Sequence, residues 1–244
     1  QIWKDFVDEL RIQLESPSGI SYEITDQQGK SQYSYGNTIV FVYNGYPTPY
    51  NVRQEIFLSF IVQEGNHIES GQWNLTLIPR NIRNGEYQMW LPVSLGSNQE
   101  TRFLEPDKEF TLTIPSTAEN VISAGAYDVR YQSYADFSGR GDQRYGVKKP
   151  DLVAPGVGIL AAAVGGGESV RSGTSMATPF VTGSAALLME WGIEKGNDPY
   201  LYGEKLKAYL RKGAKKLRGE TDYPNERVGY GALCAAQSLP QVEN

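Results

Sequence analysis

The sequence predicts two structural parts: an all-β sandwich over residues 1–115 and an α/β part, with a parallel sheet and helices, over residues 116–244. Short runs of alternating apolar and polar side chains fill the first part. Continuous apolar runs followed by long helical segments fill the second. With 244 residues, of which 40% are hydrophobic, the chain is long enough to bury a core in each part.

Six alternating runs in the first part predict half-buried β-strands. Turn-forming clusters, such as those at residues 16–19 and 84–85, separate the runs at intervals typical of a β-sandwich, and no helix-length apolar periodicity interrupts them. We therefore expect a jelly-roll-like sandwich. The predicted strands are residues 10–14, 39–43, 56–62, 73–77, 87–91 and 110–114.

The second part begins near residue 116, where the pattern changes. The apolar run at 120–126 is typical of a strand buried in a parallel sheet. A strand over 153–164 is expected to turn at three consecutive glycines, 165–167, into a second strand that ends at Ser172. These glycines lack the Lys-Ser/Thr pair and the following helix of a phosphate-binding loop, so a nucleotide site is not predicted.

Two helices are expected after these strands. The first has Ser175 as its N-cap and ends near Trp191, with Gly192 as the stop signal. The second spans residues 199–212 and follows a polar pair at 197–198 that can cap it.

Pro179 fixes the predicted start of the first helix, because proline has no backbone N–H and is tolerated in a helical run only within the first turn. With Ser175 as N-cap, residues 176–179 are that first turn. The later side chains leave almost no polar face, which predicts a helix buried on all sides, with Gly183 allowing close packing on a neighbour. A hydroxyl at the electropositive start of such a helix suits a nucleophile whose attack creates an oxyanion.

The run Gly-Thr-Ser-Met-Ala-Thr-Pro at 173–179 resembles the nucleophile segment of subtilisin-like serine proteases, the subtilases. Residues 135–141 resemble the family's loop before the last core strand, and residues 150–156 resemble the segment that leads into that strand. Downstream, residues 202–210 and 228–233 are most similar to those of the Csp-type subtilases of anaerobic spore formers, which act in spore germination.

This resemblance implies a serine endopeptidase that hydrolyses peptide bonds in a peptide or protein substrate. It assigns the nucleophile to Ser175, whose backbone N–H would stabilise the oxyanion, and a further hydroxyl near the oxyanion to Thr174. It also implies that the β-sandwich is an insertion and that the protein is extracellular or spore-associated. Met176 is either an oxidation-prone neighbour of the serine or a core residue.

Subtilases present an Asp, a His, an oxyanion-hole Asn and then the Ser in chain order, and only the Ser is identified in this sequence. The chain is therefore expected to be a C-terminal fragment, inactive alone, whose partner is the remaining N-terminal part of the same protease. The single histidine, His67, lies in a polar turn and is expected to be an ordinary loop residue.

Two alternatives to the protease remain open from the sequence. The parent could be a pseudo-protease that acts as a binding or regulatory protein through its β-sandwich. The sandwich could instead bind carbohydrate through exposed aromatic side chains, although scattered aromatics on strands more often pack a core. The aromatic residues considered are Trp3, Trp73, Trp90, Tyr33, Tyr35, Tyr43 and Tyr46.

Composition argues against several other classes of function. The net charge of −5 disfavours a nucleic-acid partner, because such proteins carry basic patches. Cys234 is the single cysteine, so an internal disulfide is excluded and a cysteine-based metal site has no support. No cofactor and no metal ligands are predicted; subtilases often carry structural calcium, and although the chain shows no EF-hand-type loop, calcium binding stays open. No run of about eighteen apolar residues occurs, so no membrane span is predicted.

Overall fold

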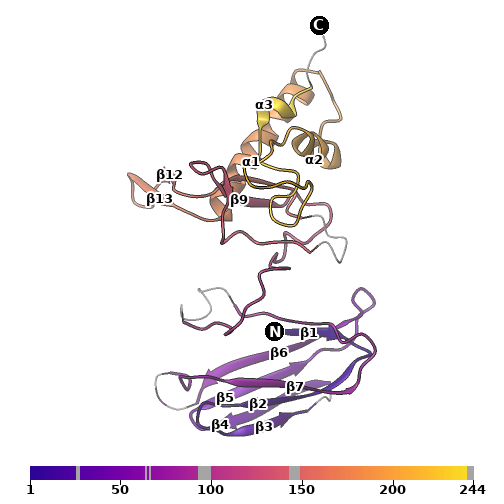
Figure 1. The fold of residues 1–244 in the computed structure, drawn as a ribbon, viewed down its shortest axis with the longest axis vertical. Helices are drawn as coiled ribbons and strands as arrows, with labels where there is room; N and C mark the ends of the chain where they lie inside the picture. Colours follow the sequence, from indigo (N-terminus) through magenta and orange to yellow (C-terminus); the bar gives the residue numbers. More distant parts are fainter. Residues whose placement is uncertain (26–27, 64, 66, 93–99, 143–148, 241–244) are drawn as a thin grey trace. The chain divides into compact units, whose positions relative to one another are not determined.

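The computed structural model describes residues 1–25, 28–63, 65, 67–92, 100–142 and 149–240. The chain divides into two compact units, Gln1–Leu104 and Glu105–Asn244 (Figure 1). Each unit has its own hydrophobic core, and each is described by itself below.

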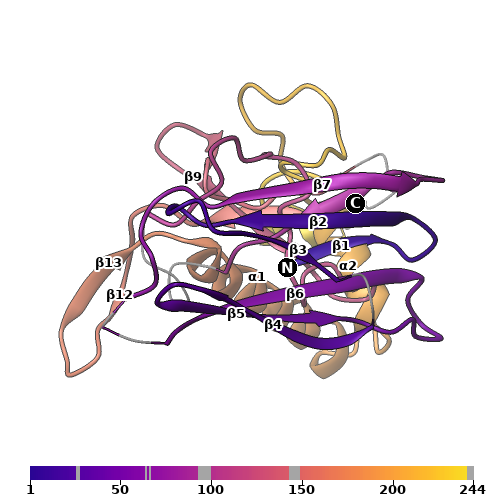
Figure 2. The same ribbon diagram turned by 90° about the horizontal axis from the view of Figure 1, so that it is seen from below.

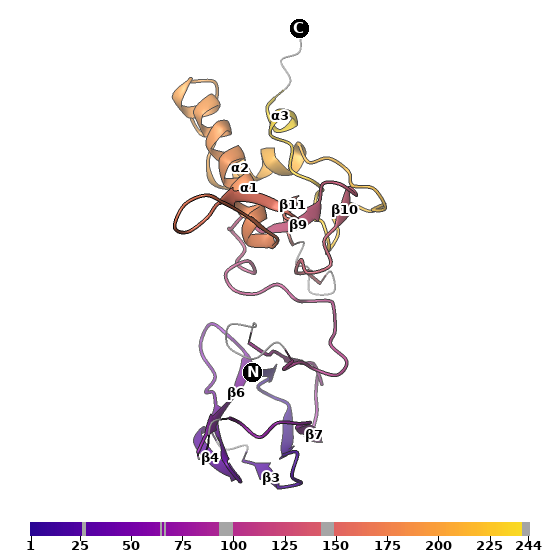
Figure 3. The ribbon, with the colours of Figure 1, turned by 90° about the vertical axis from the view of Figure 1, so that its left-hand side faces the viewer.

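The first unit is an all-β sandwich whose strands are β1 (Ile2–Asp5), β2 (Glu9–Glu15), β3 (Ser21–Ile24), β4 (Gly29–Tyr35), β5 (Thr38–Asn44), β6 (Arg53–Val62), β7 (Asn74–Asn81) and β8 (Tyr87–Met89). One antiparallel sheet has the strand order β4-β5-β6-β1-β8 and the other β3-β2-β7. Figure 2 shows β2 and β7 in one layer and β4, β5 and β6 in the other, and Figure 3 shows the two layers nearly end-on.

Side chains that alternate along the strands of both sheets meet in one apolar core. Tyr35 and Val40 of the five-stranded sheet and Ile12 and Leu14 of the three-stranded sheet are each at most 3% exposed. The Tyr35 hydroxyl donates to the carbonyl of Leu14 at 3.1 Å, so a buried hydrogen bond joins the layers. The ring of Trp73 packs edge-on against Tyr35, with centroids 5.2 Å apart. The sugar-binding alternative is therefore wrong for Tyr35, which is a core residue.

Five of the six predicted strands of this part are present, whereas the sixth, at 110–114, does not form. Instead, Thr111 donates its backbone N–H to the carbonyl of Arg140 at 2.9 Å, and its Oγ1 accepts the N–H of Arg140 at 2.9 Å. The guanidinium of Arg140 also pairs with Glu109 at 2.9 Å. This segment alternates like a strand, but its partner is a loop of the second unit. The observed division of the chain accordingly lies ahead of the predicted boundary at 115.

The second unit is built on a three-stranded sheet with the order β10-β9-β11, formed by β9 (Ala124–Asp128), β10 (Ser133–Tyr134) and β11 (Leu152–Pro155). Strands β9 and β11 are parallel, as the continuous apolar runs predicted, and β10 is antiparallel to β9. The helices are α1 (Thr174–Met189), a π-helical turn η2 (Glu190–Glu194), α2 (Gly203–Lys212) and α3 (Ala235–Ser238). Small buried residues, Ala126, Ala154 and Ala177, let α1 pack directly on the sheet.

The predicted strand at 153–164 is two strands. The chain leaves the parallel sheet after β11 and continues as β12 (Ile159–Ala162), which pairs antiparallel with β13 (Glu168–Arg171). The break falls at Gly158, whose φ of +65° lies in the left-handed region that an extended strand cannot use. The resulting hairpin turns at the predicted glycines and projects from the sheet and helices of its unit (Figure 1).

Two predicted helix ends need correction. Helix α2 begins at Gly203 and not near Pro199. The carboxylate of Asp198 accepts the N–H of Tyr200 at 3.4 Å and a hydrogen bond from Lys205 at 2.6 Å, but no helix starts at this residue. Gly192 does not stop the first helix, which continues through η2. A Cβ on Gly192 would lie 2.9 Å from the Asp198 carbonyl and from Leu201, so the glycine serves close packing.

A buried ionic cluster fixes the start of β11. The Asp151 side chain is 0% exposed; it accepts the backbone N–H of Ser123 at 2.6 Å and hydrogen bonds from Arg211. The ammonium groups of Lys149 and Lys207 lie 3.7 and 3.9 Å from the carboxylate. Burial lowers the pKa of Lys149, and the nearby Asp151 opposes this shift. The cluster joins β11, helix α2 and the loop before β9.

Among the described residues, no helix is long and apolar enough to cross a membrane. Within the same residues, His, Cys, Asp and Glu side chains form no group of three or more that could hold a metal ion.

Candidate active site at the start of helix α1

Ser175 is the second residue of α1 and not its N-cap, which corrects the predicted start of the helix. The N-cap is Gly173, with φ 155° and ψ 161°, and its carbonyl accepts the backbone N–H of Met176 at 3.0 Å. A residue with a φ this large and positive favours glycine, so the helix starts directly after it, at Thr174. Ser175 nevertheless lies in the first turn and is exposed, as a nucleophile must be.

The polar atoms of Ser175 are available for chemistry. N–H groups in the first turn have no acceptor within the helix, and no carbonyl elsewhere in the described residues accepts the N–H of Ser175. The Ser175 hydroxyl likewise makes no hydrogen bond within the part of the chain that the structure describes. The helix dipole places partial positive charge at this end. The site can therefore present a hydroxyl together with an N–H donor directed at a developing negative charge.

Thr174, the predicted second member of the site, is half-buried and opens the helix. Its carbonyl accepts a hydrogen bond from Thr178 Oγ1 at 3.0 Å, which stabilises the first turn. Met176 is half-buried, and its Sδ lies 3.4 Å from the position that a Cβ on Gly173 would occupy. The methionine side chain therefore lies against the N-cap residue, Gly173.

Pro179 is the sixth residue of α1 and lies beyond its first turn, whereas the predicted helix placed it at the end of that turn. Because proline has no N–H, the carbonyl of Ser175 loses its regular helical partner four residues on. The prediction that Pro179 is harmless within the first turn is wrong, since the helix begins before Ser175.

The faces of α1 differ more than the sequence predicted. Ala177, Val181, Ser184 and Leu188 are buried against the unit's core. The side of the helix next to this face is exposed in this chain: Phe180 and Leu187 have exposed fractions of 41% and 61%. A Cβ on Gly183 would meet no atom within 4 Å. The helix is thus buried on one side only within this chain, and the expectation of complete burial is not met.

The turn that carries Ser175 is held by the strands before it. Gly156, at the end of β11, donates its N–H to the carbonyl of Tyr127 at 3.1 Å and accepts the N–H of Gly173 at 2.8 Å. Ser172 Oγ accepts the N–H of Gly158 at 2.9 Å. Gly156 lies in the segment 150–156 that resembles the family, but no role was predicted for this residue. The sequence signal that could have indicated a packing role was a glycine placed directly after a short apolar run, where no turn requires one.

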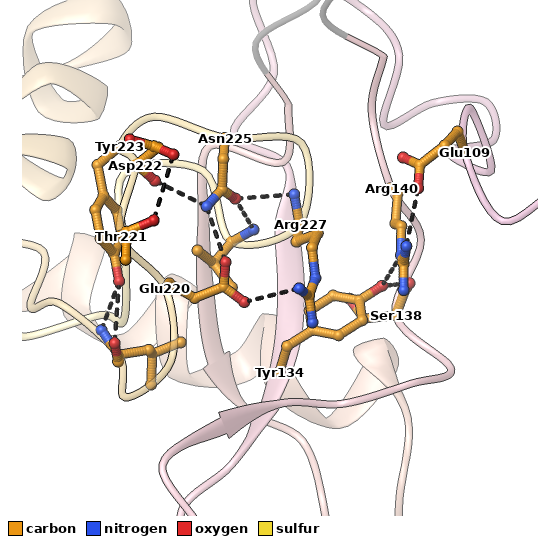
Figure 4. Close-up of polar contacts among 12 residues, drawn as sticks. Glu109, Tyr134, Ser138, Arg140, Glu220, Thr221, Asp222, Tyr223, Asn225 and Arg227 are labelled. Atoms are coloured by element: carbon orange, nitrogen blue, oxygen red, sulfur yellow. Dashed lines mark hydrogen bonds and ion pairs between the residues drawn. The ribbon is translucent and has the colours of Figure 1, made fainter.

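The loop at 135–141, ahead of the nucleophile segment, is fixed by a polar network around Tyr134 (Figure 4). Its hydroxyl donates to the carbonyl of Ser138. The guanidinium groups of Arg140 and Arg227 lie 5.2 and 4.9 Å from the centre of its ring, within range of cation–π attraction. Buried Ser138 in turn accepts the N–H of Ala126 in β9 at 3.0 Å through its Oγ. The loop is therefore tied to the central strand.

Asn225 organises the neighbouring loop in the same network (Figure 4). Its Oδ1 accepts the backbone N–H groups of Arg227 and Val228 at 3.0 and 2.8 Å. Its Nδ2 donates to Glu220 at 3.1 Å, and Glu220 pairs with Arg227 at 3.4 Å. These contacts are local and explain the shape of the loop. They bring no proton acceptor to Ser175.

The single histidine of the sequence belongs to the other unit. His67 is exposed and lies in the connection between β6 and β7, where its carbonyl accepts a hydrogen bond from Asn37 at 3.1 Å. The unit that contains Ser175 therefore supplies no imidazole of its own.

Comparison with known proteins gives consistent matches. The family model described as the subtilase family matches residues 69–231. The chain is 35% identical to the serine protease AprX of Bacillus subtilis (strain 168) over 155 residues, covering 55% of this chain and 33% of AprX. It is 45% identical to the thermophilic serine proteinase of Bacillus sp. (strain AK1) over 78 residues, which are 32% of this chain and 18% of that protein.

Among solved structures, the CspB protease of Clostridium perfringens matches 97% of this chain and 50% of its own, with 40% identity and a TM-score of 0.85. The chain thus spans half of that structure and about a third of AprX.

Proposed function

Because the chain belongs to the subtilase family, we propose that it carries the nucleophile of a serine endopeptidase and that this nucleophile is Ser175. The observation that supports this assignment best is the geometry of one residue. Ser175 is exposed in the first turn of α1, and its N–H has no acceptor among the described residues. The hydroxyl would attack the scissile carbonyl of a peptide or protein substrate, and the N–H of Ser175 would stabilise the oxyanion. Thr174 stands beside it as a second hydroxyl near the oxyanion.

The groups that activate the serine, an Asp and a His, and the Asn that completes the oxyanion hole are proposed to come from outside this chain. Two observations support this part of the proposal. The chain spans only half of the CspB structure that it matches. The exposed apolar side chains of α1, Phe180 and Leu187, offer a surface on which further protease residues could pack. The chain is then the nucleophile-bearing C-terminal portion of the enzyme, in an extracellular or spore-associated protein.

Labelling with a fluorophosphonate tests the proposal, because this reagent reacts with an activated serine. We expect the full protein that contains this chain to be labelled and its Ser175→Ala variant to remain unlabelled. Ser169→Ala, which removes a hydroxyl from β13 that is not among the contacts holding the turn, is the matched control and should keep the label. A correctly folded full protein that takes no label would contradict the enzyme and favour a pseudo-protease.

The 244-residue chain alone should be labelled very slowly even when it is folded. In subtilisin, removal of the catalytic histidine lowers turnover about a million-fold. This factor comes from subtilisin and serves here as the reference for the family. Labelling of the isolated chain at the rate of the full protein would show that the activating groups are not missing from it.

A further inference from the structure

Gly156 connects the central strand of the second unit to the turn that carries Ser175. Its N–H donates to Tyr127 at the end of β9, and its carbonyl accepts the N–H of Gly173, the N-cap of α1. Gly173 lies two residues before Ser175. The backbone of Gly156 is therefore the direct link between the sheet and the nucleophile turn.

Glycine is needed at this position because there is no room for a Cβ atom, and not because of the backbone conformation. The φ of Gly156 lies outside the left-handed region, so a side chain would be compatible with its backbone. A Cβ there would, however, lie 2.5 Å from the Cβ of Ala126 and 3.0 Å from the carbonyl oxygen of Gly173. Real Cβ atoms do not approach another carbon to 2.5 Å. One of the two neighbours would have to move.

Ala126 is the neighbour that cannot easily yield. It is 0% exposed, it pairs with Ala154 in the parallel sheet, and its N–H is held by Ser138 Oγ. The carbonyl of Gly173 can move more easily than Ala126, because it belongs to a turn and not to a buried strand. Since that carbonyl accepts the N–H of Met176 at the start of α1, moving it displaces the first turn and with it Ser175.

We propose that Gly156 is a positioning residue: the narrow gap between Ala126 and Gly173, which only a glycine fits, sets the place of the Ser175 hydroxyl and N–H. The inference rests on the proposed nucleophile and deepens it. A shift of about 1 Å in a reacting group is enough to lower a rate about 100-fold. Substrate binding should depend little on Gly156, because this residue acts on the nucleophile and not on the substrate.

The test compares Gly156→Ala with the double variant Ala126→Gly/Gly156→Ala in the full protein. For Gly156→Ala we expect fluorophosphonate labelling and kcat to fall about 100-fold per folded molecule, with KM within about two-fold of wild type. Removing the Cβ of Ala126 gives the new methyl group room on the sheet side. The double variant should therefore recover most of the labelling rate. Ala126→Gly alone controls for the effect of the small cavity.

Each outcome separates the inference from the function on which it rests. Wild-type protein without label, or Ser175→Ala with label, would overturn the nucleophile assignment itself. If the wild type is labelled and Gly156→Ala reacts equally fast, only the positioning role fails. It also fails if KM rises while kcat is unchanged, or if the folded double variant stays as slow as Gly156→Ala. Should Gly156→Ala not fold, the double variant decides: recovery of fold and rate supports the steric account, and continued unfolding contradicts it.

Discussion

At the scale of single residues, Asp8 shows how one buried carboxylate organises a loop. It is 2% exposed, and its two oxygens accept the backbone N–H groups of Arg83, Asn84 and Gly85 at 2.7, 3.0 and 2.8 Å. These hydrogen bonds, above all that from Asn84, hold the pKa of Asp8 below its ordinary value of 3.8. The ionised form is therefore preferred more strongly in the folded protein than in the unfolded chain.

This preference predicts a specific pH dependence. A carboxylate with a lowered pKa adds stability that is complete above the unfolded value of 3.8 and is lost as the pH falls through the lower folded value. We expect Asp8→Asn to lower the Tm by about 5 °C near pH 7 and the difference from wild type to shrink below pH 3.8. Thermal unfolding of both proteins over a pH series measures this difference in Tm. Glu9→Gln, an exposed neighbour, is the control, and a Tm difference that persists at low pH would contradict the assignment.

At this scale, the motif predicted Ser175 as the nucleophile, an assignment that stays a proposal, and it placed the N-cap two residues too late in the chain. Serine is a frequent N-cap, so local preference favoured the wrong residue. The structure uses Gly173 because its φ of 155° suits only glycine. The role of Gly156 could not be predicted, since it depends on Ala126, which is thirty residues away in the sequence and adjacent only in the folded sheet. Contacts of that kind leave no local pattern.

At the scale of elements, α1 carries an unpaired apolar face in this chain. Phe180, Gly183 and Leu187 follow the spacing of one helix face, and all three are exposed. In the isolated chain Gly183→Ala should stabilise the protein by about 1 kcal/mol, because alanine is the better helix former and a Cβ meets nothing within 4 Å. In the full protein we expect the opposite sign, since the proposed packing of further protease residues on this face would leave no room for a methyl group.

Unfolding in urea of the isolated chain and of the full protein measures both values. Ala186→Gly, an exposed position in the same helix, is the matched control and should destabilise the isolated chain by about 1 kcal/mol. Equal stabilisation by Gly183→Ala in both proteins would show that this face of α1 remains in solvent.

The elements that the sequence predicted correctly are those with a strong local pattern. Strand β5 alternates buried with more exposed side chains along its whole length, and β9 up to Tyr127 and all of β11 are free of charged side chains. The errors fall where a tertiary contact decides. The alternating segment 110–114 pairs with Arg140 and not with a sheet, and Asp198 binds Lys205 as well as the N–H of Tyr200 without starting a helix there. Single-sequence patterns cannot distinguish these partners.

At the scale of the whole molecule, the two-part organisation was predictable because the two halves differ in the period of their apolar residues. The position of the division was harder to predict, since residues 110–114 continue the alternation but belong with the second unit. The jelly-roll-like topology and the insertion of the sandwich into a protease stay predictions. That the activating Asp and His lie outside this chain also stays a prediction, which depends on the residue order of the family.

The division of the chain predicts that residues 1–104 fold without the rest. Their core draws on both sheets and is completed within the unit, from Ile2 to Met89. A polypeptide of residues 1–104 should show β-sheet circular dichroism and one cooperative transition in urea. Leu14→Ala, at a position 1% exposed, should lower its unfolding free energy by about 3 kcal/mol, whereas a change at exposed Gln32 should have little effect. A gradual, non-cooperative transition would mean that the sandwich depends on the second unit for its core, and its description as a separate domain would then be wrong.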